Sequence, residues 1–181
     1  MKRFPGVSSA LLLFVVSIGA LATVSEPSDV VRTTTDKILE RIKNEKESLR
    51  ENPGKMYLLV SEMVFPHFDF AIMAKWVLGR HWSETDEETR DAFVEQFRKL
   101  LVGTYATALL NFSDQAITYP PTEQTGRVNT ALVKQQITQP GSATIPVIYR
   151  LHNKSGDWKV FDVSVDGVSL VKTYKASFGS I

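Results

Sequence analysis

The sequence contains no cysteine, and its 181 residues include only three histidines, His67, His81 and His152. A chain without cysteine has no disulfide scaffold, no thiolate nucleophile and no cysteine-ligated metal site. The three histidines are far apart in the sequence, and none belongs to a recognisable set of metal ligands. We therefore expect no metal ion and no cofactor.

An excess of one charge is also missing. Lysine and arginine total 21 and aspartate and glutamate total 20, which gives a net charge of +1. Such a balance supplies no positive field to hold a phosphate backbone, so it disfavours nucleic acid as a partner. A composition with 43% hydrophobic and 23% charged residues is typical of a folded globular protein, and the length favours one domain.

The apolar run 10–21 is too short to span a membrane, which takes about 20 residues. It follows Lys2 and Arg3 and ends at Ala20-Leu21-Ala22, a small-x-small pattern. This arrangement is typical of a cleaved secretory signal peptide. We predict a signal peptide over residues 1–22 and a single domain over 23–181, exported to the periplasm if the source is a Gram-negative bacterium.

Apolar residues with helical spacing predict four helices in the first part of the domain. We expect Ser28 or Asp29 to cap the first helix and Asp69 to cap the third. Thr85 with Glu88 resembles a capping box for the fourth. The third helix is apolar nearly all round, which predicts that it is buried. The predicted helices cover residues 28–50, about 56–64, 70–78 and 86–111.

After residue 114 the period of the apolar residues changes to two, which predicts β-strands. Short breaks at Pro140-Gly141 and at 153–156 predict two hairpins. We expect Phe161, Val163 and Val165 to share one face of the last strand, and a final helix to begin near Val168. The predicted strands cover residues 115–119, 127–138, 144–152 and 158–165. Helices followed by four antiparallel strands predict an α+β fold, with a helical layer packed on the sheet.

Few residues suggest catalysis. His67 and Asp69 are two residues apart and are a candidate base and orienting acid, and Asp162 with Asp166 is a candidate carboxylate pair. No glycine-rich phosphate loop or G-x-S-x-G motif is present. Three functional classes stay open on this basis: an exported enzyme that uses His67 with Asp69 or Asp162, an interaction module with a filled core, and a binding protein with an apolar pocket.

Three blocks of the sequence resemble the MlaC/toluene-tolerance family, and together they extend over residues 28–181. In chain order they are Phe68-Asp69-Phe70 with Met73-Ala74 and Val77-Leu78-Gly79-Arg80-His81-Trp82; Phe93, Phe97 and Leu100-Leu101 with Thr104-Tyr105; and Trp158-Lys159-Val160-Phe161-Asp162-Val163 with Asp166-Gly167-Val168-Ser169-Leu170-Val171 and Tyr174. The last block is the most specific. Members of the family usually continue beyond the segment that matches residues 177–181 with a further apolar helix.

The resemblance implies a periplasmic protein, without catalytic residues, that shuttles phospholipid between the inner and outer membranes and maintains the lipid asymmetry of the outer membrane. It implies an apolar cavity between a twisted four-stranded sheet and a helical layer. The implied partners are an inner-membrane ABC transporter with its MCE-domain protein and an outer-membrane lipoprotein–porin complex. We assign lipid binding to residues on the inferred inner faces: Phe70, Met73, Val77, Phe97, Leu101, Tyr105, Val147, Tyr149, Phe161, Val163, Val171 and Tyr174.

The signal pattern predicts that the mature protein begins at Thr23 and carries a net charge of −1, because cleavage removes Lys2 and Arg3. N-terminal sequencing of the protein recovered from the exporting cell checks this. A chain that retains Met1 would contradict the prediction of export.

Overall fold

The structure is a computed structural model that describes residues 26–112, 115–154 and 156–179. The predicted signal peptide lies outside these residues. The helices of the described residues are α1 Pro27–Glu51, α2 Pro53–Met63, a 3₁₀ turn Phe65–His67, α3 Phe70–Leu78, α4 His81–Glu84, α5 Glu87–Leu110 and α6 Leu170–Gly179. Its strands are β1 Ala116–Thr118, β2 Glu123–Gln124, β3 Thr130–Thr138, β4 Ile145–Lys154, β5 Asp157–Val165 and β6 Val168–Ser169. None of the helices in these ranges is both long and apolar enough to cross a membrane.

The long helices form where the spacing predicts them, but two of their caps differ. Helix α1 begins one residue earlier than predicted, with Glu26 as its N-cap residue, because proline fits the first helical position. Helix α5 is capped by Asp86, whose side chain accepts a hydrogen bond from the Thr89 amide at 2.7 Å. Thr85, the predicted cap, instead donates to the carbonyl of Trp82. The short helix α4 was not predicted.

Helix α3 has the predicted bounds, and Asp69 caps it by accepting a hydrogen bond from the Ile72 amide at 3.0 Å. The prediction that this helix is buried all round is wrong on one side. Trp76 keeps 45% of its surface exposed, and its indole lies edge-on against the ring of Phe161.

The strands form one antiparallel sheet in the order β1-β3-β4-β5-β6, with β2 also paired to β3. Both predicted hairpins are present, joining β3 to β4 and β4 to β5. The two-residue strands β2 and β6 were not predicted. Val168 pairs with Val165 across Asp166-Gly167, and both turn residues have positive φ, as a tight hairpin requires. Helix α6 therefore begins at Leu170, later than expected.

A β-bulge changes which residues of β5 face the helices. Arg150 pairs with Asp162 and Leu151 pairs with Val160, so that Phe161 is the extra residue. Because a bulge shifts the alternation of side chains, Val160 joins Val163 and Val165 on the inner face. The prediction that Phe161 shares this face is wrong.

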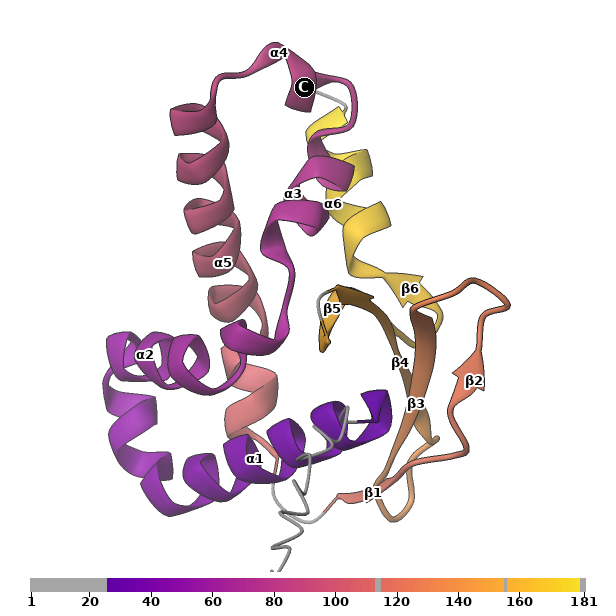
Figure 1. The fold of residues 1–181 in the computed structure, drawn as a ribbon. Helices are drawn as coiled ribbons and strands as arrows, with labels where there is room; N and C mark the ends of the chain where they lie inside the picture. The colour runs from indigo at the N-terminus through magenta and orange to yellow at the C-terminus, as the bar shows by residue number, and fades with distance from the viewer. Residues whose placement is uncertain (1–25, 113–114, 155, 180–181) are drawn as a thin grey trace, which may run out of the picture.

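Figure 1 shows α3 beside α6 and the strands β3, β4 and β5 next to one another. The buried apolar residues of the helices and the sheet form three clusters. The α1–α2–α5 cluster contains Ile38, Ile42, Leu49, Met56, Leu59, Val60 and Val102. The sheet cluster contains Val31, Val133, Val147, Leu151, Val160 and Val163. The α3–α6 cluster contains Phe70, Met73, Val77, Phe97 and Val171. One central core would hold these residues together, so the division indicates a space between them.

A buried carboxylate attaches α6 to the sheet. Asp162 on β5 accepts a hydrogen bond from Arg150 at 2.9 Å, from the Ser169 hydroxyl and from the Val171 amide. Asp162 is 4% exposed, and Arg150 also donates to Ser164. The carboxylate thus satisfies a donor at the start of α6, where helical amides lack partners.

We predict that Asp162→Ala lowers the free energy of unfolding by about 2–4 kcal/mol, because it leaves buried donors without an acceptor. Asp166→Asn is the matched control: this exposed residue lies in the β5–β6 turn, and asparagine tolerates its positive φ. Urea unfolding of both variants checks the prediction. Equal stability of the two variants would contradict it.

Candidate functional site

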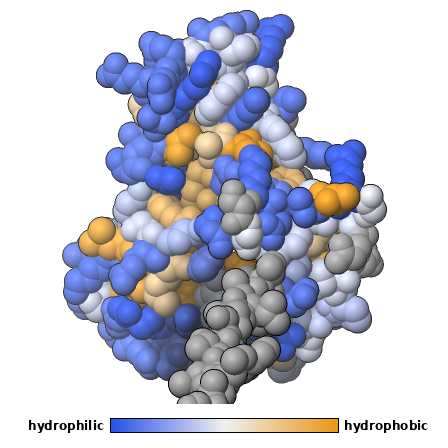
Figure 2. Space-filling view, in the orientation of Figure 1, coloured by the Kyte–Doolittle hydropathy of each residue, from blue (hydrophilic) through white to orange (hydrophobic). Residues whose placement is uncertain are grey.

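A large apolar cavity lies between the sheet and the helices. Its volume is about 690 Å³, within the range of roughly 300–1,000 Å³ that is typical of ligand pockets. Residues of α1, α2, α3, α5, α6 and strands β1, β3, β4 and β5 line it. Figure 2 shows apolar surface exposed in the middle of one face, bordered by hydrophilic side chains. The space between the three clusters is therefore open to a ligand.

Most of the residues that the sequence assigned to lipid binding surround this cavity. Phe70 and Met73 come from α3, and Leu101 and Tyr105 come from one side of α5, four residues apart. The sheet supplies the others. The predicted residues that line the cavity are Phe70, Met73, Leu101, Tyr105, Val147, Tyr149 and Val163.

The other predicted site residues do not line it. Val77, Phe97 and Val171 are buried in the α3–α6 cluster, with Tyr174 packed against them. The ring of Phe97 lies 5.4 Å from that of Tyr174, edge to face. Phe161 contacts Trp76 because of the bulge. Helical periodicity identifies the buried face of α3, α5 and α6, but this face packs against other helices over most of its length.

Helix α1 and strands β1, β3 and β4 contribute wall residues that the sequence did not suggest. In α1 these include two threonines beside apolar residues. A helix face of such mixed polarity is only a weak indication that it lines a cavity. The additional residues include Val30, Val31, Thr34, Thr35 and Ile38 of α1, Ile117 of β1, Gln135 and Ile137 of β3, and Ile145 of β4. The apolar positions Val31 and Ile38 were the available signal.

A small polar network lies in the otherwise apolar wall. Gln135, which is 2% exposed, accepts a hydrogen bond from the Tyr149 hydroxyl at 2.9 Å. Its amide nitrogen donates to the hydroxyls of Tyr119 at 3.0 Å and Thr35 at 3.4 Å. Burial raises the pKa of Tyr149 far above 10, so this hydroxyl stays protonated and remains a donor. The network satisfies its own members and joins α1 to β3, β4 and the segment that follows β1.

Charged groups gather near one part of the wall. His67 lines the cavity, and Lys159 on β5 donates to the adjacent carbonyl of Pro66 at 2.6 Å. Burial lowers the pKa of His67 below 6.5, and the positive charges of Lys159 and Lys37 lower it further. The imidazole is therefore neutral at pH 7.

The structure does not bring His67 and Asp69 together as a base and its orienting acid. The carboxylate of Asp69 pairs instead with His152, at 2.9 Å, and caps α3. Asp162 is bound by Arg150 and Ser169, while Asp166 lies in the exposed turn. Each of these groups thus has a structural role, and in the described ranges no three His, Asp or Glu side chains are grouped as a metal site would require.

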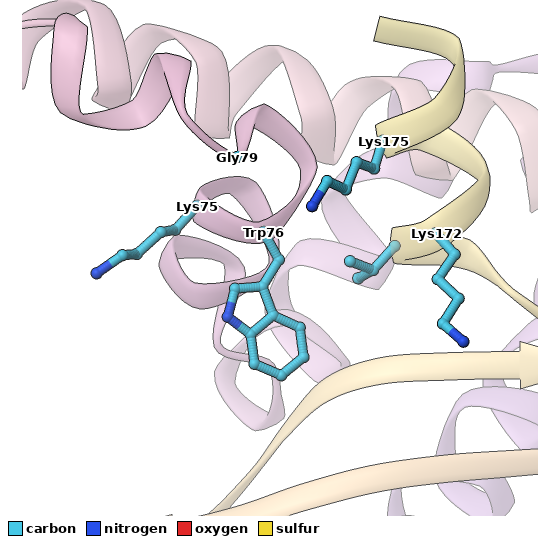
Figure 3. Close-up of a pocket in the computed structure, with 6 residues that line it drawn as sticks. Lys75, Trp76, Gly79, Lys172 and Lys175 are labelled. Atoms are coloured by element: carbon cyan, nitrogen blue, oxygen red, sulfur yellow. The ribbon is translucent and has the colours of Figure 1, made fainter. Parts of the chain in front are cut away.

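A second, smaller hollow of about 370 Å³ lies on the surface between α3 and α6. Figure 3 shows Lys75 and Trp76 on one side of it and Lys172 and Lys175 on the other. Its lysines and its open shape suit it poorly for an apolar ligand. The larger cavity is the candidate functional site.

The chain is similar to known proteins along nearly its whole length. The family model described as MlaC protein matches residues 32–181. Toluene tolerance protein ttg2D of Pseudomonas putida is 31% identical over 170 residues, which cover 92% of this chain and 79% of that protein. The intermembrane phospholipid transport system binding protein MlaC of Haemophilus influenzae is 28% identical over 174 residues, covering 94% and 81%.

A solved structure shares the fold. The phospholipid-binding protein of Ralstonia solanacearum, determined in complex with a phospholipid, superposes with a TM-score of 0.80 at 28% sequence identity. The match covers 87% of each chain.

We predict that Gln135→Leu lowers the free energy of unfolding by about 1–3 kcal/mol, because the partly buried Tyr149 and Tyr119 hydroxyls lose their partner. Gln136→Leu is the matched control on the same strand: its side chain is exposed and bonds only to Thr118 among the partners seen. We expect it to change stability by less than about 0.5 kcal/mol. Thermal or urea unfolding checks both, and a control as destabilised as Gln135→Leu would contradict the assigned role.

Proposed function

The chain belongs to the MlaC protein family, and we propose that it is a phospholipid-binding shuttle that carries lipid between two membranes. The observation that supports this most directly is that the apolar cavity lies in a fold shared with a protein whose structure was determined with phospholipid bound. A curated relative of similar length is a binding protein of intermembrane phospholipid transport.

An apolar cavity is what lipid transport through water requires. Each methylene group that is buried contributes about 0.8 kcal/mol, so acyl chains cross an aqueous space only when a protein covers them. Phe70, Met73 and Leu101 supply such cover from the helices, and Val147 and Val163 supply it from the sheet. We propose that these residues contact the acyl chains, together with Tyr105, Tyr149 and the wall residues of α1.

The chain is a transport protein and not an enzyme. Its relatives are named for lipid binding, transport or toluene tolerance. The polar groups beside the cavity fit this role, because Asp69 and Gln135 are fully engaged in contacts that hold the fold. The bound group is cargo, which must be released intact.

We further propose that the protein works in the periplasm. The signal pattern of residues 1–22 and the intermembrane system of a relative support this location. Its partners in this proposal are an inner-membrane ABC transporter with its MCE-domain protein, which exchanges lipid at one membrane, and an outer-membrane lipoprotein–porin complex at the other. Together they maintain the lipid asymmetry of the outer membrane.

We predict that Leu101→Trp displaces phospholipid with a loss of stability below about 1 kcal/mol, because the indole enters open space beside the helix. Phe97→Trp, one turn away on α5, is the matched control. Phe97 is 2% exposed in a packed cluster, so we expect overpacking to cost typically 1–3 kcal/mol while lipid is retained.

Mass spectrometry of organic extracts and thermal melts of both purified variants measure these effects. An extract of the unaltered protein without phospholipid would contradict the proposed function. Lipid retained by Leu101→Trp with a sharply lowered melting temperature would instead show that Leu101 belongs to the packed core.

A further inference from the structure

The surface hollow between α3 and α6 is positively charged. The segments 70–83 and 168–181, which contain these helices, carry four of the lysine and arginine residues of the chain and none of its aspartate or glutamate. The residues that line the hollow form a basic hollow: Lys75, Trp76, Gly79, Val171, Lys172 and Lys175. A chain whose total charge is nearly balanced thus concentrates positive charge on one patch.

The lysines of the basic hollow have no counter-charge. Within residues 26–112, 115–154 and 156–179, none of Lys75, Lys172 and Lys175 forms an ion pair with a carboxylate. All three side chains are exposed. On α5, by contrast, Lys99 lies within 3.9 Å of Glu95. Positive charges gathered without acidic neighbours attract an anionic partner.

Lys175 reaches across the hollow from α6 to α3. A Cβ atom at Gly79 would lie 3.5 Å from Cε of Lys175 and 3.7 Å from its Nζ, and Gly79 ends α3. An ammonium is favourable there, because the carbonyl groups of a helix C-terminus carry partial negative charge. Lys75 and Lys172 extend to opposite sides of the indole of Trp76 (Figure 3), so their charges are available to a partner.

Trp76 adds an amphipathic side chain to this patch. Its indole packs edge-on against Phe161, with ring centroids 5.1 Å apart, and 45% of the residue stays exposed. An indole has an apolar body and one N–H donor, which suits a boundary where an apolar phase meets water. The basic hollow therefore presents positive charge and an interfacial aromatic group together.

This combination favours a lipid surface over a protein partner. Protein interfaces are depleted of lysine and enriched in arginine, whose planar fork recognises a carboxylate. The described residues that line the basic hollow include three lysines and no arginine. Ammonium groups on flexible stems suit phosphate groups that move within a bilayer surface, and tryptophan is enriched at the level of the headgroups.

We propose that the basic hollow binds the surface of an anionic bilayer, with lipid phosphate groups against its three lysines and the indole of Trp76 at the level of the headgroups. Helix α3 then separates the bilayer from the cavity, because Phe70 and Met73 of the same helix line the cavity. No residue of the basic hollow lines the cavity. The proposal therefore goes beyond the carriage of lipid and does not depend on it.

The test uses the purified protein with its lipid cargo and vesicles of equal parts phosphatidylglycerol and phosphatidylcholine. We expect the protein to sediment with these vesicles, less so as salt screens the charges, and much less with phosphatidylcholine alone. For Lys75→Gln/Lys172→Gln we expect the affinity to fall at least about tenfold, because each lysine near an anionic surface contributes about fivefold. This variant keeps Lys175 and its contact with the end of α3. No binding by the unaltered protein, or equal binding by the variant, would overturn the proposal.

Two exposed lysines of α1 provide a matched control. Lys37→Gln/Lys43→Gln removes the same charge and leaves the basic hollow intact, so we expect the affinity for vesicles to change less than about twofold. An equal loss in both variants would show that total charge decides binding and would overturn the proposal. Mass spectrometry of the bound lipid separates this question from the proposed function: protein that carries phospholipid but ignores vesicles contradicts the bilayer contact alone, and vesicle binding by protein without phospholipid contradicts the proposed function alone.

The fluorescence of Trp76 reports which face is in contact. The variant Trp82→Phe/Trp158→Phe keeps Trp76 as the one remaining tryptophan of the sequence. We expect vesicles that contain phosphatidylglycerol to reduce the quenching of Trp76 by acrylamide, because the bilayer covers the exposed part of the indole. Unchanged quenching in vesicle-bound protein would show that another face makes the contact. If poly-L-glutamate protects Trp76 and the vesicles do not, the basic hollow binds an acidic polypeptide and the bilayer assignment is wrong.

Discussion

The fold is organised around a space that its own side chains must not fill. A domain of this size ordinarily stabilises itself with one contiguous core, but here the buried residues form three clusters around the cavity. Each wall therefore has to be stable without support from the centre. The long α1–α2 hairpin packs on α5, α3 packs on α6, and the sheet is held by its own ladder, so each unit has its own apolar contacts.

Directional polar contacts then fix these units relative to one another. Asp69 caps α3, pairs with His152 of β4, and donates its own amide to the carbonyl of Val160 on β5. Asp162 attaches the start of α6 to β5, and Gln135 joins α1 to the sheet. Apolar packing tolerates sliding, whereas hydrogen bonds of defined geometry do not. Buried polar groups at the junctions thus keep the walls apart at the spacing that a ligand needs.

The sequence predicted the parts of this structure that depend on local pattern. Helix α3 has its predicted bounds because Asp69 is a strong start signal and Gly79 a strong stop signal, and both hairpins follow from their turn residues. The bulge at Phe161 escaped prediction because one extra residue leaves no compositional trace, yet it decides whether Phe161 or Val160 faces inward. Periodicity also shows only that a face is covered. It does not show whether side chains or an open space cover it. Phe97 and Leu101 lie four residues apart on α5 and both pack in the α3–α6 cluster, but of the two Leu101 alone lines the cavity.

The arrangement of polarity in the cavity bears on how cargo is released. The polar groups inside the wall, Gln135 with Thr35, Tyr119 and Tyr149, bond to one another. In our proposal the lipid is therefore held there by contact area and not by directional bonds. Contact area changes gradually as acyl chains slide outward, because each methylene group contributes its own small increment. Affinity built in this way is divided into many small steps, and a shuttle that must accept lipid at one membrane and release it at another needs that property.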